Sequence, residues 1–599
     1  MAAKTKLELT WIGKEKRPRL EPRILLEDPS KSYHAAQRVS DSDLFDNRLI
    51  FGDNLLALKA LEQEFTGKIK CVYIDPPFNT GAAFEHYDDG IEHSLWLSLI
   101  KERLEILERL LAKNGVIFVH IDDKEMAYLR VLMDEVFSRS NFLNMIVVKT
   151  SDPSGHKTVN PSPYSQTEYI LMYAKDRANY IYEQRYVPSA HDSMYGKFVE
   201  NREDDFRNWR IVSLADAAAR SRSFDSPANA RKSMGKLDFE AFTAQFALEN
   251  VDAVFQSTAI SDDAGKAIVM VRDQSANAEG VVFHVPRVGY EDIYILNGRQ
   301  MYFYSSKVRN IDGKRTPAKP LTNLWTDIPW NGIAGEGGVS FKNGKKPERL
   351  IRRCVQMASD PGDIVLDSFA GSGTTGAVAH KMGRRWIMVE LGEHCHTHIM
   401  PRVKKVIDGI DTGGVTEATK WKGGGGFRYY RLAPSLLEKD KFGNWVVSKG
   451  YNAAMLAKAM CKLEGFTYAP SSDVYWQQGH STEQDFIYVT TQTLTREMLA
   501  KLSDDVGEGR SLLICCGAFR SGKSEYPNLT LKKIPKAVMS RCEWGKDDYS
   551  LQIAALPKAM PPDDDLPQRP TLAPGEQRKQ RKARVSEPSL FGGENGGAK

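Results

Sequence analysis

The sequence lacks several features that would assign it to particular protein classes. Its seven cysteines are scattered and form no C-x-x-C pair, which is unlike a disulfide framework and typical of a reducing compartment. No apolar run is long enough to span a membrane, and the N-terminus has no apolar signal segment. From these absences we expect a cytoplasmic protein without membrane contact.

A strong overall charge and internal repeats are also missing. The net charge of +5 is small for 599 residues, so the charge balance alone does not indicate nucleic acid. Basic residues gather only locally, as seven Lys or Arg among the first 23 residues and as "RKQRKAR" at 578–584. Such tails are usually solvated, although they also bind phosphates. A chain of this length without a tandem repeat predicts more than one domain.

Apolar runs alternate with helical spacing in two separate parts of the chain. In the first, "NRLIF", "CVYI" and "VIFVHI" predict buried strands separated by amphipathic helices, and in the second "DIVLD" and "RWIMVEL" continue the pattern. This alternation predicts an α/β domain with a mostly parallel sheet. Between the two parts the alternation fails in a stretch rich in Arg, Tyr, Ser and Asp. We interpret that stretch as an insertion or a separate recognition domain.

These patterns divide the chain into six parts. "KGGGG" at 422–426 is interpreted as a hinge, and the residues after 555 are Pro-, Asp-, Arg- and Gly-rich, which is typical of disorder. The expected parts are a basic arm (1–45), a first α/β half (46–178), an irregular middle region (179–330), a second α/β half (331–422), a smaller α/β domain (423–555) and a disordered tail (556–599).

The stretch "CVYIDPPFNTG" places a carboxylate, two prolines and an aromatic ring directly after a buried strand. Asp75 then lies at the carboxyl end of the strand, where open α/β sheets bind ligands. Pro76 and Pro77 lack backbone donors and fix the chain direction. What remains is a set of acceptors beside the flat ring of Phe78, which suits a planar group that donates hydrogen bonds. Taken alone, the motif is equally consistent with a rigid turn.

A second motif, "VLDSFAGSGTTG", combines a strand, a carboxylate and a glycine-rich turn that leads into a helix. Glycines allow close approach of a ligand to the backbone, and a helix N-terminus offers free N–H groups. Glu390 ends the next strand 23 residues after Asp367, a spacing that suits a carboxylate on ribose hydroxyls. Such a turn alone is weak evidence, because it is also compatible with a dinucleotide site or a simple tight turn.

Together, the two motifs resemble those of amino DNA methyltransferases, which use S-adenosylmethionine (AdoMet). In that family D-P-P-[YF] is the catalytic motif and F-x-G-x-G the cofactor motif. Here the catalytic motif comes first and a long middle region follows, which resembles the circularly permuted β group. The opening "LELTWIGKEKRPRLEPRILLED", the "GDNLLALKAL" box and the chain length resemble modification subunits of type III restriction systems. The motif resemblance covers roughly residues 40–180 and 340–410.

The resemblance implies a class I methyltransferase fold, with a seven-stranded Rossmann-like sheet that has one antiparallel strand, and a target-recognition domain in the middle region. It places "LIFGD" after "WIMVEL" in the sheet and Asp53 at the adenine ring of AdoMet, and it assigns Lys346 and Pro347 to the start of the helix before the cofactor motif. No metal is expected. The implied catalytic residues are Asp75, Pro76, Pro77 and Phe78, and the implied cofactor residues are Asp53, Asp367, Phe369, Ala370, Gly371, Ser372, Gly373, Thr374 and Glu390.

The implied activity is methylation of adenine N6 in double-stranded DNA after base flipping. Phe78 replaces the commoner Tyr of the motif, and Ser368 stands where many relatives have Pro. Asp75 rather than Ser favours adenine, but cytosine N4 remains an alternative, as does an idle specificity subunit that only binds DNA. A C5-cytosine mechanism is set aside because no Pro-Cys occurs. By analogy with type III systems, a homodimer and a helicase–nuclease partner are expected.

Two further patterns are interpreted as decoys. "GAFRSGKS" at 517–524 matches a P-loop, but the following "EYPNLTLKKI" has no helical period, so we predict a hairpin loop without ATP binding. "HCHTH" at 394–398 resembles a zinc-binding pattern, but no second ligand cluster is visible, and a first helical turn is the preferred interpretation.

Overall fold

The computed structural model describes residues 8–77, 89–152, 163–341, 344–520 and 525–550. The chain divides into two compact units, residues 1–79 with 94–551 and residues 80–93 with 552–599. Residues 89–93 are the described part of the second unit, and they begin helix α2 (Asp89–Leu110). The architecture below is that of the first unit.

The centre of this unit is a mixed sheet in which strands from the two predicted α/β halves lie side by side. Among its seven central strands, neighbours are parallel except β7, which runs antiparallel to both of its neighbours, as the expected fold requires. In spatial order the seven strands are β3 (Asn47–Phe51), β19 (Arg385–Glu390), β18 (Ile364–Asp367), β4 (Ile69–Ile74), β5 (Leu111–Ile121), β7 (Thr167–Ala174) and β6 (Phe142–Lys149).

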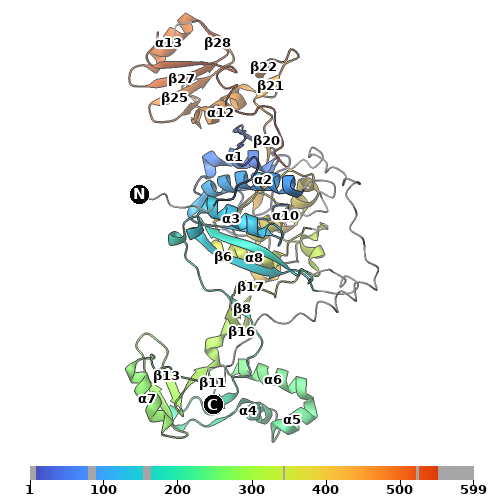
Figure 1. Ribbon diagram of the computed structural model, residues 1–599, viewed down its shortest axis with the longest axis vertical. Helices are drawn as coiled ribbons and strands as arrows, with labels where there is room; N and C mark the ends of the chain where they lie inside the picture. The colour runs from blue at the N-terminus through green and yellow to red at the C-terminus, as the bar shows by residue number, and fades with distance from the viewer. Residues whose placement is uncertain (1–7, 78–88, 153–162, 342–343, 521–524, 551–599) are drawn as a thin grey trace, which may run out of the picture. The chain divides into compact units, whose positions relative to one another are not determined.

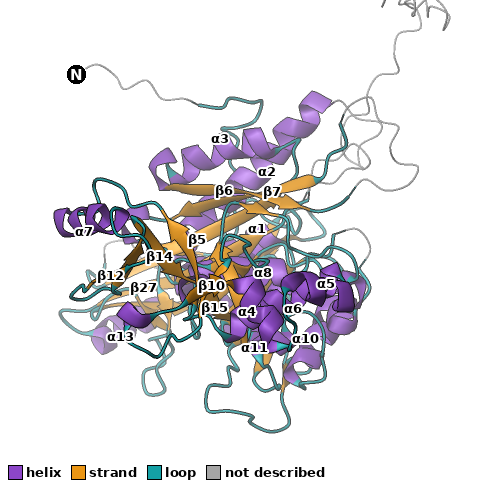
Figure 2. Cartoon of the chain, turned by 90° about the horizontal axis from the view of Figure 1, so that it is seen from below, coloured by secondary structure: helices purple, strands orange, loops and turns teal. Residues whose placement is uncertain are grey.

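Two layers of helices cover this sheet, because alternate strand residues face opposite sides. In β4, for example, Val72 packs in one core cluster and Tyr73 in the other. The two layers are seen in Figure 1, and Figure 2 shows α2 and α3 over β6 and β7. One layer is α1 (Asn54–Phe65), α2 and α3 (Met126–Phe137), and the other is α8 (Glu348–Ala358), α9 (Thr374–Lys381) and α10 (Met400–Ile407).

The sheet extends beyond its seven central strands at the β3 end. The predicted glycine hinge is a packed segment: a Cβ on Gly424 would lie 2.6 Å from an Asp43 carboxylate oxygen, so glycine is required for close contact. The chain then continues as β20 (Gly426–Leu432), which pairs with β3. Within the predicted basic arm, β1 (Leu25–Glu27) and β2 (Tyr33–His34) pair with β20. The described part of that arm is therefore packed.

The middle region forms sheets of its own rather than an irregular loop. Its six-stranded sheet is antiparallel, and a three-stranded sheet joins it to the main sheet through β17 (Leu324–Trp325), which pairs with β6. The elements are β8 (Tyr186–Pro188), β9 (Lys197–Val199), β10 (Ile211–Ser213), α4 (Leu214–Ser221), α5 (Pro227–Met234), α6 (Lys236–Glu249), β11 (Val254–Thr258), α7 (Lys266–Ala276), β12 (Val282–Val285), β13 (Ile293–Leu296), β14 (Arg299–Phe303), β15 (Val308–Ile311) and β16 (Lys314–Pro320).

The C-terminal region contains a smaller α/β unit, built around the predicted segments "DFIYV" and "SLLICC". Residues 521–524 of the P-loop match lie outside the described residues, but the segment after them forms β29 (Leu529–Lys533) and not a helix. The main elements of this C-terminal α/β unit are α12 (Ala453–Glu464), β23 (Thr467–Tyr468), β24 (Gly479–His480), β25 (Asp485–Val489), α13 (Arg496–Val506), β27 (Ser511–Cys516) and β29.

Two of the expected absences can be compared with the structure. All seven cysteines are buried free thiols. No helix in the described ranges combines the length and the apolar character that crossing a bilayer requires.

Candidate active site

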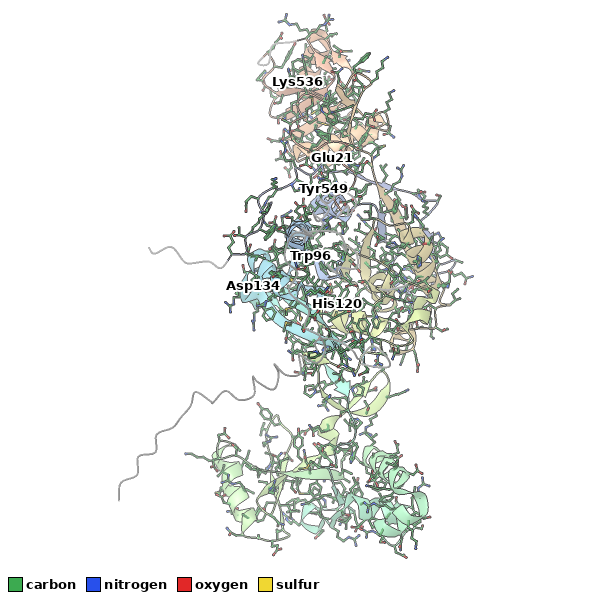
Figure 3. The ribbon with its side chains drawn as sticks, turned by 45° about the vertical axis from the view of Figure 1, so that its right-hand side comes forward. Glu21, Trp96, His120, Asp134, Lys536 and Tyr549 are labelled. Carbon is green, nitrogen blue, oxygen red and sulfur yellow. The ribbon has the colours of Figure 1, made fainter. Side chains whose placement is uncertain are left out.

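The DPPF turn leaves the sheet at the carboxyl end of β4, and its conformation is held by a tryptophan from α2. The indole Nε1 of Trp96 donates a hydrogen bond to the Pro77 carbonyl at 2.8 Å, and Trp96 itself is 1% exposed (Figure 3). Asp75 and Pro76 precede this anchor, whereas Phe78 lies outside the described residues. The anchor therefore fixes the turn from the side of the helix layer.

A chain of polar side chains runs from Asp75 into the sheet. Lys346 Nζ lies 3.4 Å from Asp75 Oδ1 and 3.0 Å from Glu168 Oε2. The same Glu168 oxygen accepts a hydrogen bond from His120 Nε2 at 2.7 Å, and His120 Nδ1 lies 2.9 Å from the Tyr73 hydroxyl. A single lysine thus bridges the carboxylate of the motif and a second carboxylate, that of Glu168.

The charges in this chain compensate one another. Burial raises the pKa of Asp75, and Lys346 and His120 oppose that effect only in part. Burial also pushes the pKa of Glu168 upward, but the hydrogen bond from His120 and the charge of Lys346 prevail and lower it to about 2. For Lys346, burial lowers the pKa, yet the two carboxylates outweigh burial and raise it. Lys346 is therefore a cation, and Glu168 holds it against Asp75.

The glycine-rich turn leaves the neighbouring strand β18 on the same side of the sheet. Strands β18 and β4 are parallel, with Val365 opposite Cys71, so the two motifs end at one edge. The Asp367 carboxylate accepts hydrogen bonds from Phe369 N (2.9 Å) and from the Thr375 hydroxyl (2.6 Å). Burial raises the pKa of Asp367 to about 7. Asp367 thus ties the start of the turn to the first turn of α9.

Two glycines give this turn its shape. Gly371 and Gly373 have φ values of +52° and +76°, which favour glycine. A Cβ on Gly373 would lie 3.0 Å from Ile399, whereas a Cβ on Gly371 would meet nothing closer than 3.8 Å. The space above Gly371 is therefore open, and a ligand can approach the backbone there. This open backbone fits the adenosyl part of AdoMet.

Glu390 holds the turn from the end of β19. Its Oε2 accepts a hydrogen bond from Gly371 N at 2.8 Å, and its Oε1 accepts hydrogen bonds from Gly392 N and His394 Nε2, both at 2.9 Å. The predicted spacing of Asp367 and Glu390 therefore brings both carboxylates to the turn. A ribose contact by Glu390 stays a prediction.

Asp53 lies next to this turn but makes different contacts from those expected. Its Oδ1 accepts a hydrogen bond from Leu56 N at 3.0 Å and caps α1, and its Oδ2 accepts one from Tyr549 N at 2.9 Å. Arg103 lies 3.7 Å from Oδ2, and Asp53 is 1% exposed. Both oxygens are therefore engaged within the protein, and a contact with adenine stays a prediction.

The other residues of the turn are buried to different degrees. Ala370 is buried and donates its N–H to the Val389 carbonyl at 3.2 Å, and Phe369 packs against the core cluster under α1–α3. Arg402 Nη1 donates to the Thr374 hydroxyl at 2.7 Å and to the Ser372 carbonyl at 3.3 Å. The side chain of Thr374 therefore faces the protein interior.

The histidines of the "HCHTH" pattern make contacts within the protein. His394 pairs with Glu390, and His398 Nε2 lies 3.1 Å from the Ser340 carbonyl. Across the described ranges, no three His, Cys, Asp or Glu side chains come together as a metal site requires. The segment Cys395–Ile399 forms a single helical turn before α10.

Sequence reasoning missed His120, Glu168, Tyr73 and Trp96, and assigned Lys346 only to the start of a helix. One hint was available, because a histidine within the apolar run "VIFVHI" is unusual in a buried strand. Glu168 offers no such hint. It reaches the site because β7 runs antiparallel, so its first residues lie at the edge where the parallel strands end.

Comparisons with known proteins found similar DNA methylases. A DNA methylase model of the N6/N4 type matches residues 69–401. The probable type III restriction-modification enzyme HindVI Mod subunit of Haemophilus influenzae is 36% identical over 435 residues, 68% of this chain and 56% of that protein. The EcoPI Mod subunit of Escherichia phage P1 is 29% identical over 434 residues, 63% of this chain and 62% of that protein.

Among solved structures, the complex of M1.HpyAVI with SAM is 12% identical, with a TM-score of 0.28, and the match covers 59% of this chain and 98% of that one. The chain spans less than two thirds of the length of the HindVI and EcoPI Mod subunits.

Proposed function

This chain belongs to the N6/N4 DNA methylase family, and on that premise we propose that it methylates the exocyclic N6 of adenine in double-stranded DNA, using AdoMet. The observation that supports the proposal most directly is the pairing of β4 with β18. Adjacent parallel strands are about 4.8 Å apart, so the acceptor turn at Asp75 and the glycine-rich turn end side by side. A flipped base and a methyl donor held by these turns would meet at this edge.

The chemistry follows from the nature of the amino group. The lone pair of adenine N6 is delocalised into the ring, so the nitrogen is a poor nucleophile. Asp75 and the Pro76 carbonyl would accept its two N–H groups and draw the lone pair out of conjugation. The Asp75 carboxylate would also stabilise the positive charge that develops on the nitrogen. AdoMet, when bound, supplies an electrophilic methyl group.

The series of polar side chains that begins at Lys346 and ends at Tyr73 keeps this carboxylate ionised. Stabilising the developing charge requires an ionised carboxylate, and burial raises the pKa of Asp75. Lys346, fixed by Glu168 and His120, would keep Asp75 ionised and in place before the base arrives. Phe78 would stack on the flipped base, with Pro77 as the wall of the pocket. Asp53, Asp367, Phe369–Thr374 and Glu390 would hold the cofactor.

The biological setting proposed is that of the relatives. We assign the chain as a modification subunit of a restriction or related defence system, acting in the cytoplasm with a helicase–nuclease partner and as a homodimer by analogy. Residues 179–330 would read the DNA target. N4-cytosine methylation is the alternative, and Asp at position 75 favours adenine over it. An idle specificity subunit would not need both the Asp75–Lys346 pair and the open turn at Gly371.

The substitution Asp75→Ala tests the proposal. We expect methyl transfer to fall at least about a hundredfold, the scale of losing one preorganised electrostatic group. AdoMet and DNA binding should persist, because they depend on other contacts. The assay is tritiated methyl transfer to DNA, with nucleoside mass spectrometry of the product. Asp123→Ala, which removes an exposed carboxylate at the end of the next strand, is the control and should retain activity.

Two results would contradict this proposal. Full activity of Asp75→Ala would remove the carboxylate from the mechanism, and N4-methylcytosine as the wild-type product would select the alternative. Asp75→Ser should be nearly inactive on adenine without gaining cytosine activity, since the pocket shape also selects the base.

A further inference from the structure

An arginine-lined pocket lies along the outer face of α8. It has a volume of about 400 Å³ and is lined by three segments: the residues that lead into and form β8, the residues of β15, and the outer face of α8. Five of the lining side chains are Arg185, Arg309, Arg349, Arg352 and Arg353. Such a concentration of guanidinium groups in one pocket requires an explanation, because like charges repel.

The spacing of apolar residues in α8 explains why its arginines lie on the outer face of the helix, but not why they gather in one pocket. Leu350, Ile351, Cys354 and Val355 are buried against the sheet, and the arginines occupy the remaining positions of the helix. Two of them are neutralised in bidentate pairs, Arg352 with Asp312 and Arg353 with Asp327. These pairs join α8 to the segments after β15 and β17.

Positive charge remains after these pairs are counted. Arg185 pairs with the exposed Glu183, but across the described residues no carboxylate lies within ion-pair distance of Arg309 or Arg349. Five arginines and three carboxylates leave an excess of two positive charges. The Arg309 guanidinium is stacked 5.0 Å from the Tyr186 ring centroid, which holds it at the pocket.

Two of these arginines have a donor that the described residues do not use. The Nε atoms of Arg185 and Arg352 are buried, and neither has a hydrogen-bond partner within the described part of the chain. Leaving a buried donor unsatisfied is costly, and an anionic oxygen would satisfy it. Guanidinium forks match the geometry of phosphate oxygens, and both arginines retain an unused donor. The chemistry points to a phosphate.

We propose that this pocket holds a backbone phosphate of the DNA substrate next to the flipped base. The proposal rests on the proposed function and adds a contact to it. Lys346 reaches Asp75, and Arg349 follows only three residues later, within about one helical turn of 5.4 Å. Strands β8 and β15 belong to the middle region, so the pocket lies where that region meets α8, and a duplex that contacts both the middle region and Asp75 would reach it. A glycine-rich phosphate loop, which a free nucleotide would require, does not line it.

The double substitution Arg309→Ala with Arg349→Ala tests this inference, because it leaves the ion pairs of Arg352 and Arg353 intact. We expect the affinity for duplex DNA to fall at least about tenfold for cognate and unrelated sequences alike. The slope of log affinity against log salt should decrease by about one to two. Affinity for AdoMet and thermal stability should be unchanged. The control is Arg496→Ala with Arg510→Ala, which removes two arginines of the C-terminal unit.

DNA binding is measured by fluorescence anisotropy without turnover, and methyl transfer is measured separately. Unchanged affinity and salt slope in the double variant would overturn the inference while the proposed function stands. Wild-type protein that binds no duplex and forms no methylated base would overturn both. Loss of binding to pyrophosphate or to an acidic protein partner, with DNA affinity intact, would assign the pocket to that ligand and also overturn the inference.

Discussion

A carboxylate stabilises the positive charge that develops on an amino nitrogen only while it is ionised, and at Asp75 ionisation depends on the neighbouring groups. The charged and titratable groups that face Asp75 are Lys346, His120, Glu168, Tyr73 and Asp367, from five different segments. Of these, Lys346 opposes the effect of burial most strongly. The lysine is thus the residue on which the acceptor depends.

The substitution Lys346→Met should make methyl transfer sensitive to acid. Burial already raises the pKa of Asp75, and loss of the lysine raises it further, so the ionised fraction falls at a higher pH than in wild type. The acid limb of the single-turnover rate, measured from about pH 5.5 to 9.5, should shift upward. The loss should therefore be largest at the acid end.

Lys346→Arg should largely restore the wild-type profile, because the charge remains. Lys124→Met, which removes an exposed lysine near the end of β5, is the matched control and should have no effect. A pH profile of Lys346→Met that is parallel to that of wild type would show that the lysine has only a structural role.

At the residue scale, the sequence predicts what is contiguous and misses what depends on register. Asp75 and Asp367 each follow a strand within a short motif, and the structure brings both to one edge. Glu168 and His120 meet only because β5 and β7 pair with His120 opposite Ile170. That pairing joins distant parts of the chain, and local propensity contains no information about it. The contact of Asp53 with Tyr549 could not be predicted for the same reason, since the two residues are almost 500 positions apart in the sequence.

At the element scale, the glycine-rich turn depends on the end of its neighbouring strand. Glu390→Ala should weaken AdoMet binding by about 1–3 kcal/mol, because Gly371 N loses its acceptor and the turn is no longer held. Isothermal titration calorimetry measures this loss. Glu393→Ala, at an exposed carboxylate three residues away, is the control. Unchanged AdoMet affinity in Glu390→Ala would exclude Glu390 from the cofactor site.

The long strands and helices of the main sheet were predictable, whereas the middle region was not. Helix α2 ends at Leu110, because Leu111 already pairs with Ile69 in the sheet. In the middle region many strands have only three to five residues, and they pair antiparallel with distant partners. Such strands show little alternation, so the sequence resembles a loop. The glycines at 423–426 were misinterpreted because close packing and flexibility both favour glycine.

At the scale of the whole molecule, the P-loop match should not provide a second activity. Lys523→Ala should leave methyl transfer unchanged, and the purified chain should not hydrolyse ATP with or without DNA. The reason is that the segment after the match forms strand β29, parallel to β27, so no helix N-terminus follows to hold phosphate. DNA-stimulated hydrolysis that Lys523→Ala abolishes would contradict this prediction.

The pairing of β4 with β18 also has a consequence for how the protein is made. About 290 residues separate Ile74 from Ile364, and ribosomes add roughly 5–20 residues per second. For about 15–60 s, the emerging chain therefore contains β4 with one open edge, and β3 without either of its neighbours in the finished sheet, β19 and β20. Open strand edges invite pairing with other chains. The nascent protein consequently exposes edges at which other chains can pair, until the last strands of its sheet leave the ribosome.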